Sequence, residues 1–308
     1  MGKSERPAIN QAGFLSHLCS PERKPLQVQR QLTMKLSRAP RPSLRPFVDV
    51  IWASDGETSP VPQIGWKELV LPTGATHIVF RLGDTPLRIY RDRDDILGQN
   101  VGTSLIGGAR ATPYIKDVSI SAPSVGAVLR PGAIDVLADV SAIELAGRHT
   151  QLENLLPHSR LSSIIDQLRE TSQICARLRI FEDFLSSRLP QVHAIHPLVA
   201  HALERFDARA CVWDIVTETG FSQRHFTRTF TQWVGLAPKT YCRVRRFGRV
   251  LKQMDAILAP NLADLAAAEG YADQAHMTRE FRALAGLTPA QYVTVSPAHR
   301  YHVPFGRL

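Results

Sequence analysis

Short apolar runs separated by turn residues dominate the chain from about residue 44 to residue 147. Several of these runs have the length and composition of β-strands, and they cover residues 47–53, 68–71, 77–82, 87–90, 104–106, 118–121 and 125–129. Gly83-Asp84, Pro86 and Pro131-Gly132 supply turns between them. Many short strands at this spacing predict a β-sandwich or a small β-barrel.

The hydrophobic period becomes that of a helix between residues 151 and 190. Two apolar stripes run through this segment, one made of Leu161, Ile164, Ile165 and Leu168, the other of Ile174, Leu178, Phe181, Leu185 and Leu189. Two amphipathic helices of this kind can pack either on the barrel or on a second subunit. The region therefore predicts a linker that packs on the chain itself or forms a homodimer.

Residues 190–197 contain two prolines and predict a hinge, after which helical periodicity continues. Pro197 suits the first position of a helix. A longer helix is predicted over residues 239–255, where apolar side chains recur every three or four residues. The fold class that follows is α+β multidomain, with an N-terminal β-barrel or sandwich, amphipathic helices, and an all-α C-terminal domain.

The C-terminal domain contains one module twice. Residues 235–241 read Gly-Leu-Ala-Pro-Lys-Thr-Tyr, and residues 286–292 read Gly-Leu-Thr-Pro-Ala-Gln-Tyr. In each copy a short helix is expected to end at a glycine, Gly220 or Gly270. Ser222 or Asp273 then stands where an N-cap is needed, and a second helix follows. A helix, a tight turn and a second helix predict a helix-turn-helix in both copies.

The second helix of each copy has an apolar face and a polar face. The polar positions are Arg224, Thr227, Arg228 and Thr231 in the first copy, and Ala275, Thr278, Arg279 and Arg282 in the second. A single surface arginine is most simply a solvated side chain. Because both copies place Thr-Arg on the face away from the core, however, the pair predicts insertion into a DNA major groove.

Charge is unevenly distributed over the 308 residues, whose formal net charge is +9. Residues 1–46 carry a net charge of +7, residues 47–196 carry −3, and residues 197–308 carry +5. Residues 222–252 hold eight Lys or Arg and no acid. This concentration predicts phosphate contacts, and the candidates are Thr231, Arg243, Arg245, Arg246, Arg249 and Arg282. The alternative is a solvated helix face.

Residues 221–230 and 271–289 resemble the two recognition segments of AraC/XylS-type transcription regulators. The resemblance covers roughly residues 196–295, about a third of the chain, and its second half is highly specific. It implies base contacts from Arg224, Thr227, Arg228, Gln274, Ala275 and Arg279. Val216 stands where the family usually has alanine, and Ala275 offers only a methyl group.

Residues 71–74, 107–108 and 128–132 resemble the cupin-like sensor domains that precede some AraC-type DNA-binding domains. The candidate effector pocket is made of aromatic and polar side chains, namely Trp52, Trp66, His77, Tyr90 and Arg130. Each of these also fits an ordinary core or surface role. A metal site is not expected, since His77 is the only histidine between residues 47 and 148.

The sequence thus predicts five segments. They are a disordered basic tail at 1–40, a cupin-like β sensor domain at 41–150, a helical linker or dimerisation region at 151–195, an AraC-type double helix-turn-helix domain at 196–296, and a C-terminal tail at 297–308. Met34 is an alternative first residue of the protein. No apolar run approaches the ~18–20 residues of a membrane span, and a cytoplasmic location is expected. Four scattered cysteines predict neither metal binding nor disulfides.

The function that follows is a sequence-specific DNA-binding transcription regulator that responds to a small-molecule effector. Its expected partners are double-stranded DNA at a promoter-proximal operator, RNA polymerase, the effector and a second copy of the chain; no cofactor and no catalysis are expected. Two alternatives stay open. One is a ligand-independent DNA-binding protein whose N-terminal domain serves only assembly. The other is a DNA-repair enzyme fused to this type of domain.

Overall fold

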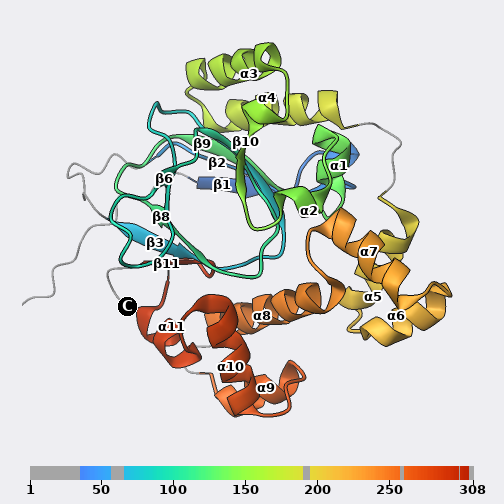
Figure 1. Ribbon diagram of the computed structural model, residues 1–308. Coiled ribbons are helices and arrows are strands. Elements are labelled where there is room, and N and C mark those ends of the chain that lie inside the picture. Colours follow the sequence, from blue (N-terminus) through green and yellow to red (C-terminus); the bar gives the residue numbers. More distant parts are fainter. Residues whose placement is uncertain (1–34, 57–65, 190–194, 257–259, 298, 305–308) are drawn as a thin grey trace, which may run out of the picture. The chain divides into compact units, whose positions relative to one another are not determined.

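The computed structural model describes residues 35–56, 66–189, 195–256, 260–297 and 299–304 (Figure 1). The predicted tail at 1–34, including Met34, and most of the predicted hinge lie outside these residues. Within them, no helix is long and apolar enough to cross a membrane.

Two antiparallel sheets form the N-terminal β-domain (described residues 35–189), and the C-terminal segment adds one strand to them. Sheet A has the order β1-β2-β9-β4-β7-β10, with β1 Lys35–Arg38, β2 Val48–Ser54, β9 Ser124–Leu129, β4 Thr76–Arg81, β7 Ser104–Gly107 and β10 His149–Gln151. Sheet B has the order β11-β3-β8-β5-β6, with β11 His302–Pro304, β3 Lys67–Val70, β8 Tyr114–Asp117, β5 Arg88–Tyr90 and β6 Gln99–Asn100. The predicted β-rich domain is confirmed.

Three local predictions about strands differ from the structure. The strand expected at 118–121 is wrong, because β8 ends at Asp117, whose carboxylate accepts the Ser119 N–H at 2.8 Å and turns the chain. Residues 35–38, expected in the disordered tail, form β1. The C-terminal tail contains β11, which pairs with β3 so that His302 lies opposite Val70. β11 depends on a partner far away in sequence, whereas β1 pairs with β2, the next strand along the chain.

Alternation along the central strands decides which face of sheet A carries the domain's apolar core. Ile51, Ile78, Phe80 and Ala127 point to one face and are fully buried. Helices cover this face (Figure 1), and the helices of the β-domain are α1 Ala133–Ala138, α2 Ala142–Leu145, α3 His158–Glu170 and α4 Ile174–Arg188.

The two apolar stripes predicted between residues 151 and 190 pack within the chain. Phe181 lies edge-on against Phe80 with a ring separation of 5.8 Å. Glu182 accepts two hydrogen bonds from the Arg38 guanidinium, at 3.1 and 2.8 Å, which attaches α4 to β1. Because these stripes are buried against the chain's own sheet, they are not available for contacts with a second subunit. The homodimer stays a prediction, with no surface assigned to it.

The C-terminal domain (described residues 195–297) is helical, as predicted. Its helices are α5 Pro197–Asp207, α6 Val212–Thr219, α7 Gln223–Val234, α8 Pro238–Ala256, α9 Leu262–Ala268, α10 Gln274–Ala285 and α11 Pro289–Val295. One apolar cluster runs through both copies of the module, and it also takes in Leu69, Ile115 and Val303 from the outer face of sheet B. The helical domain and the sheet therefore share buried apolar surface.

Candidate nucleic-acid interface

The first helix-turn-helix is built by its turn residues. Gly220 ends α6 with a φ of 70°, a left-handed conformation that glycine adopts without steric strain. The Ser222 hydroxyl then accepts the backbone N–H of His225 at 3.2 Å and starts α7. These two residues set the angle at which α7 leaves the turn.

The second helix-turn-helix repeats this construction. Asp273 accepts the backbone N–H of His276 at 2.6 Å and starts α10. Gly286 ends α10 with a φ of 72°. Thr288 and Gln291 form a reciprocal capping box at the start of α11.

Aromatic contacts pack the second helix of each module, α7 or α10, against a neighbouring helix. In the first copy, Phe230 packs edge-on against Phe206 of α5 with a ring separation of 5.5 Å. In the second, Phe281 packs against Phe247 of α8 at 5.0 Å. The apolar faces of α7 and α10, which carry these rings, are fully buried, so the opposite faces of the two helices must point outward.

The side chains predicted to read bases lie on those outward faces. Arg224, Arg228, Gln274, Ala275 and Arg279 are exposed, and Thr227 is half-buried. Within the described part of the chain, no ion pair is recorded for Arg224, Arg228, Arg279 or Arg282. Their guanidinium groups therefore keep their donors available for an external anion.

The arginines of α8, predicted to contact phosphates, have partners inside the domain. Arg243 pairs with Glu280 at 2.6 Å, Arg245 with Asp207 at 2.8 Å, and Arg249 with Glu269 at 2.6 Å. Arg246 lies over the ring of Tyr271 at 5.0 Å. The positive run on α8 is thus largely neutralised by acids from α5, α9 and α10.

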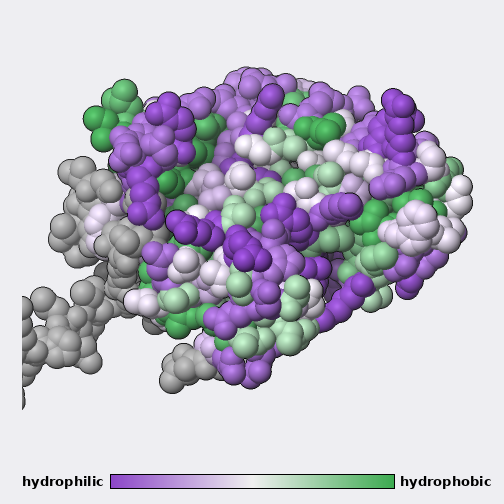
Figure 2. Space-filling model, turned by 60° about the horizontal axis from the view of Figure 1, so that its bottom comes forward, coloured by the Kyte–Doolittle hydropathy of each residue, from purple (hydrophilic) through white to green (hydrophobic). Residues whose placement is uncertain are grey.

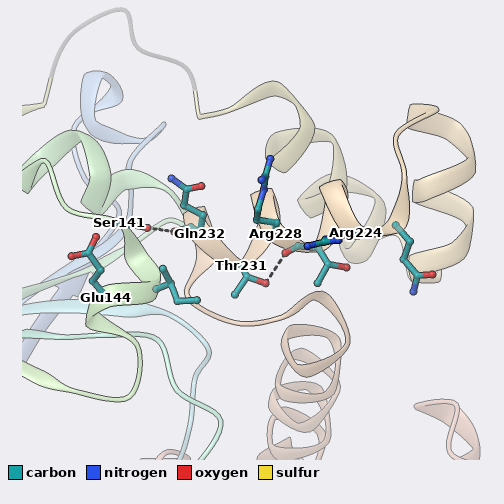
Figure 3. Close-up of a pocket in the computed structure, with 9 residues that line it drawn as sticks. Ser141, Glu144, Arg224, Arg228, Thr231 and Gln232 are labelled. Carbon is teal, nitrogen blue, oxygen red and sulfur yellow. Dashed lines mark hydrogen bonds between the residues drawn. The ribbon is translucent and has the colours of Figure 1, made fainter.

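A groove of about 1020 Å³ lies along the outward face of α7 (Figure 3). One wall is α7 itself, with Arg224, Thr227, Arg228 and Thr231. The other wall is α2 of the β-domain, whose Ser141 hydroxyl donates a hydrogen bond to the backbone carbonyl of Gln232 at 3.0 Å. The predicted base-reading residues of the first copy therefore line a concave surface.

The groove also contains side chains that the sequence did not point to. Ile143 and Glu144, both exposed, come from α2 and lie about 80 residues before α7. No periodicity or motif signals such a meeting, because it depends on tertiary packing alone. The carboxylate of Glu144 puts a negative charge on the wall opposite α7, where a phosphate backbone would be repelled.

Hydrophilic side chains are spread over the face brought forward in Figure 2, with smaller hydrophobic areas between them. A mixed surface of this kind does not by itself mark a binding site. The site assignment therefore depends on the unpaired arginines of α7 and α10.

The residues predicted to form an effector pocket are only partly brought together. Trp52 and His77 lie on the same face of sheet A. Trp66 is 57% exposed, Tyr90 donates a hydrogen bond to Asp117 at 2.8 Å, and Arg130 pairs with Asp49 at 3.0 Å. Trp66, Tyr90 and Arg130 thus have surroundings of their own, apart from those of Trp52 and His77.

The described residues bring together no three His, Cys, Asp or Glu side chains that could hold a metal ion. Cys175, Cys211 and Cys242 are free thiols. Burial raises the pKa of Cys242 to about 11, which disfavours the nucleophilic thiolate there.

Comparisons with known proteins agree with this description. Residues 215–294 match the model of a helix-turn-helix domain family, and residues 37–151 match a family described as a domain of unknown function. The F1 operon positive regulatory protein of Yersinia pestis is 35% identical over 78 residues, which cover 25% of this chain and 26% of that protein. The match thus spans about a quarter of that relative's length.

Among solved structures, ToxT from Vibrio cholerae is similar with a TM-score of 0.40 and 9% identity, covering 76% of this chain and 97% of that chain. A second ToxT structure, described as bound to an unsaturated fatty acid, has a TM-score of 0.38 and 9% identity, covering 85% and 94%.

A β-rich domain followed by two helix-turn-helix units with exposed arginines defines a DNA-binding protein of the helix-turn-helix class. More specifically, its C-terminal domain is of the AraC type.

Proposed function

We propose that this chain is a transcription regulator that reads a promoter-proximal operator with α7 and α10. The supporting observation is the contrast between two sets of arginines. Those on the recognition helices are exposed and without ion pairs, whereas Arg243, Arg245 and Arg249 on α8 are paired with acids. Two recognition helices on one rigid domain would enter successive major grooves, ~34 Å apart on one face of the duplex.

Each recognition helix would contribute its own readout. In the first copy, Arg224 and Arg228 would donate to guanine edges, with Thr227 between them. In the second, Arg279 would do so, Gln274 would pair with adenine, and Ala275 would contact a thymine methyl group.

The phosphate contacts would come from fewer residues than the charge run suggests. Arg282 and Thr231 lie on the recognition helices, and the Arg246 side chain has no acid partner recorded in the described residues. Arg243, Arg245 and Arg249 would reach phosphates only by leaving their present ion pairs.

The β-domain would sense a small-molecule effector and bias the protein between two arrangements of different operator affinity. The Yersinia relative is named as a positive regulator of an operon, and we extend activation, with contact to RNA polymerase, to this chain. A homodimer on the operator belongs to the same proposal. No catalytic step is part of it.

The test selects binding sites from random duplex DNA with the full chain, then measures affinities across a salt series. Arg228→Ala and Arg279→Ala should each cost ~1–3 kcal/mol and relax preference at one base position. Arg282→Ala should weaken all sequences alike. Arg91→Ala in the β-domain, an exposed arginine, is the matched control.

Equal behaviour of the base-reading and phosphate variants would refute the site assignment, and failure to select any sequence would refute the regulator. The second candidate function, a ligand-independent DNA-binding protein, would be favoured if operator affinity stayed constant across a broad panel of metabolites. Methyl transfer to a cysteine would instead favour the repair enzyme.

A further inference from the structure

A smaller cavity, of about 170 Å³, lies against α8 inside the C-terminal domain. Its other walls come from the end of α5 with the residues that follow it, and from the end of α9. None of the described residues that line it belongs to α7 or α10, whose outward faces carry the predicted base-reading side chains. The cavity is therefore a feature separate from those two faces.

Four guanidinium groups and one carboxylate line the α8 cavity. They belong to Arg209, Arg245, Arg246, Arg249 and Glu269. The buried carboxylate of Glu269 is shared, because one oxygen lies 2.6 Å from Nε of Arg249 and the other lies 3.5 Å from Nη2 of Arg209. Nη2 of Arg245 lies 2.8 Å from a carboxylate oxygen of Asp207. Four positive charges are thus opposed by two negative charges, so a net charge of +2 remains among these described residues.

Arg246 is the lining arginine for which the described ranges record no acid partner. Its guanidinium carbon lies 5.0 Å from the centre of the Tyr271 ring, a contact that engages the positive charge of the group. No acceptor for its N–H groups is recorded in the same ranges, and the side chain is half-buried. A bound anion would therefore replace hydration that Arg246 has partly lost.

The backbone of Arg209 lies in the left-handed region, with a φ of 67°. Arg209 is the second residue after α5, a position where glycine is common because a side chain is strained in this conformation. Its Nη1 donates a hydrogen bond to the carbonyl oxygen of Ala268 at 3.0 Å, beside Glu269. Backbone strain of this kind is concentrated at functional sites. The chain thus keeps a guanidinium at the cavity where glycine would fit the backbone better.

The size and charge of the cavity indicate the class of its ligand. A water molecule needs about 10–15 Å³ of such a space, so a cavity of about 170 Å³ has room for a phosphate group. Guanidinium groups bind phosphate oxygens through paired N–H donors. A phosphate monoester carries a charge of about −1.5 to −2 at pH 7, which matches the two uncompensated positive charges. A diester of the DNA backbone carries only one negative charge.

We propose that the α8 cavity binds the phosphate group of a small phosphate monoester, held by Arg246 and Arg209. Arg245 and Arg249 stay in their ion pairs and add positive charge at the wall. The bound group would join the segment before α6, through Arg209, to the turn before α10, through Arg246 and Tyr271. Arg246 is also a proposed contact to the DNA backbone, so the monoester would compete with DNA for this side chain; that consequence rests on the proposed function.

The test measures calorimetric binding and thermal stability of the full chain in a phosphate-free buffer at neutral pH and constant ionic strength. Methyl phosphate and inorganic phosphate should bind saturably and raise the melting temperature. Dimethyl phosphate is the matched diester, with one negative charge like the DNA backbone. It should bind about tenfold more weakly than methyl phosphate, because one of the two positive charges stays uncompensated.

Three variants locate the binding at this cavity. Arg246→Met should weaken methyl phosphate binding by about tenfold or more, because it removes the guanidinium without an acid partner. Lys252→Met removes a positive charge from an exposed position of α8 that does not line the cavity, and its affinity should not change. Arg209→Gly should also weaken binding while the protein still folds, since glycine adopts that backbone conformation without strain.

The inference is overturned if neither methyl phosphate nor inorganic phosphate binds, if dimethyl phosphate binds as tightly as methyl phosphate, or if Arg246→Met and Lys252→Met have the same affinity. A folded Arg209→Gly variant that binds methyl phosphate like the unchanged protein overturns it as well. Sequence-specific DNA binding is measured in the same preparations. If methyl phosphate does not bind while DNA selection persists, only this inference fails, whereas lost DNA selection with methyl phosphate still bound refutes the proposed function alone.

Discussion

The ion pair between Arg249 of α8 and Glu269 at the end of α9 provides a sharp test of how the domain uses its arginines. The Glu269 side chain is 1% exposed, and its carboxylate lies 2.6 Å from Nε of Arg249. Gln253 donates to the same carboxylate at 2.5 Å, and Arg209 lies 3.5 Å from it. We expect Arg249 to stabilise the packing of α9 on α8 and not to bind phosphate in the free protein.

The expected magnitude follows from burial. A hydrogen bond to a charged group contributes ~1.5–3 kcal/mol, but the Arg249 side chain is 34% exposed, and solvent screens part of that. Glu269→Gln should therefore lower the free energy of unfolding by about 2 kcal/mol, and Arg249→Met by about 1–2 kcal/mol. In the double variant, the coupling energy between the two positions should be about 1 kcal/mol.

The assay is urea unfolding of the four proteins of the cycle, followed by circular dichroism, together with the salt dependence of operator binding. Arg282→Met, an exposed arginine of α10, is the control whose stability should not change. A coupling energy near zero would refute the reasoning. The reasoning would also be refuted if Arg249→Met left the stability unchanged but reduced the slope of log affinity against log salt concentration by about one, because that loss indicates a phosphate contact.

The remaining predictions concern the groove, the core and the histidines. Glu144→Gln removes the negative charge opposite α7 and should tighten operator binding by about two- to fivefold at low salt; the same gain with Glu170→Gln, on α3, would mean only a net-charge effect. Phe281→Ala removes a fully buried ring that contacts Phe247 and should cost ~3–5 kcal/mol of unfolding free energy, measured in urea, so a loss under about 1 kcal/mol would contradict the packing. Burial lowers the pKa of His77 from 6.5 to about 4, so below pH 6.5 the unfolded state takes up a proton that the folded state does not. Stability should then fall as pH drops from 6.5 towards 4. His77→Gln should reduce the slope of the unfolding free energy against pH by an amount that corresponds to up to one bound proton, and an unchanged slope would show that other groups cause it.

Sequence patterns were most reliable where the interactions that define an element are local. Ser222 and Asp273 cap α7 and α10 as their positions predicted, and Gly220 has the positive φ expected at the end of α6. These contacts join residues only a few positions apart, so the sequence carries them directly. The segment at 118–121 shows the limit. Its apolar composition suited a strand, but an aspartate-centred turn ended β8 before it.

The candidate pocket shows a second limit. Trp52 and His77 share an inner face of sheet A with His149, which comes from β10, far along the chain. The Tyr114 ring of sheet B meets the His149 ring edge-on at 4.6 Å, and neither residue belongs to a sequence motif. Only the pairing of strands brings them together.

By itself the sequence determined the order of the domains, the duplication of the helix-turn-helix and the polar faces of its second helices. These follow from period, capping residues and repeated spacing, all of which act between near neighbours. Only the tertiary structure decided which arginines remain unpaired, since the acids that neutralise Arg243, Arg245 and Arg249 come from other helices. The tertiary structure also decided that α2 borders the groove along α7 and that β11 is the edge strand of sheet B next to β3. An ion pair or an added strand depends on where distant segments meet in space, and the pattern of neighbouring residues does not determine where they meet.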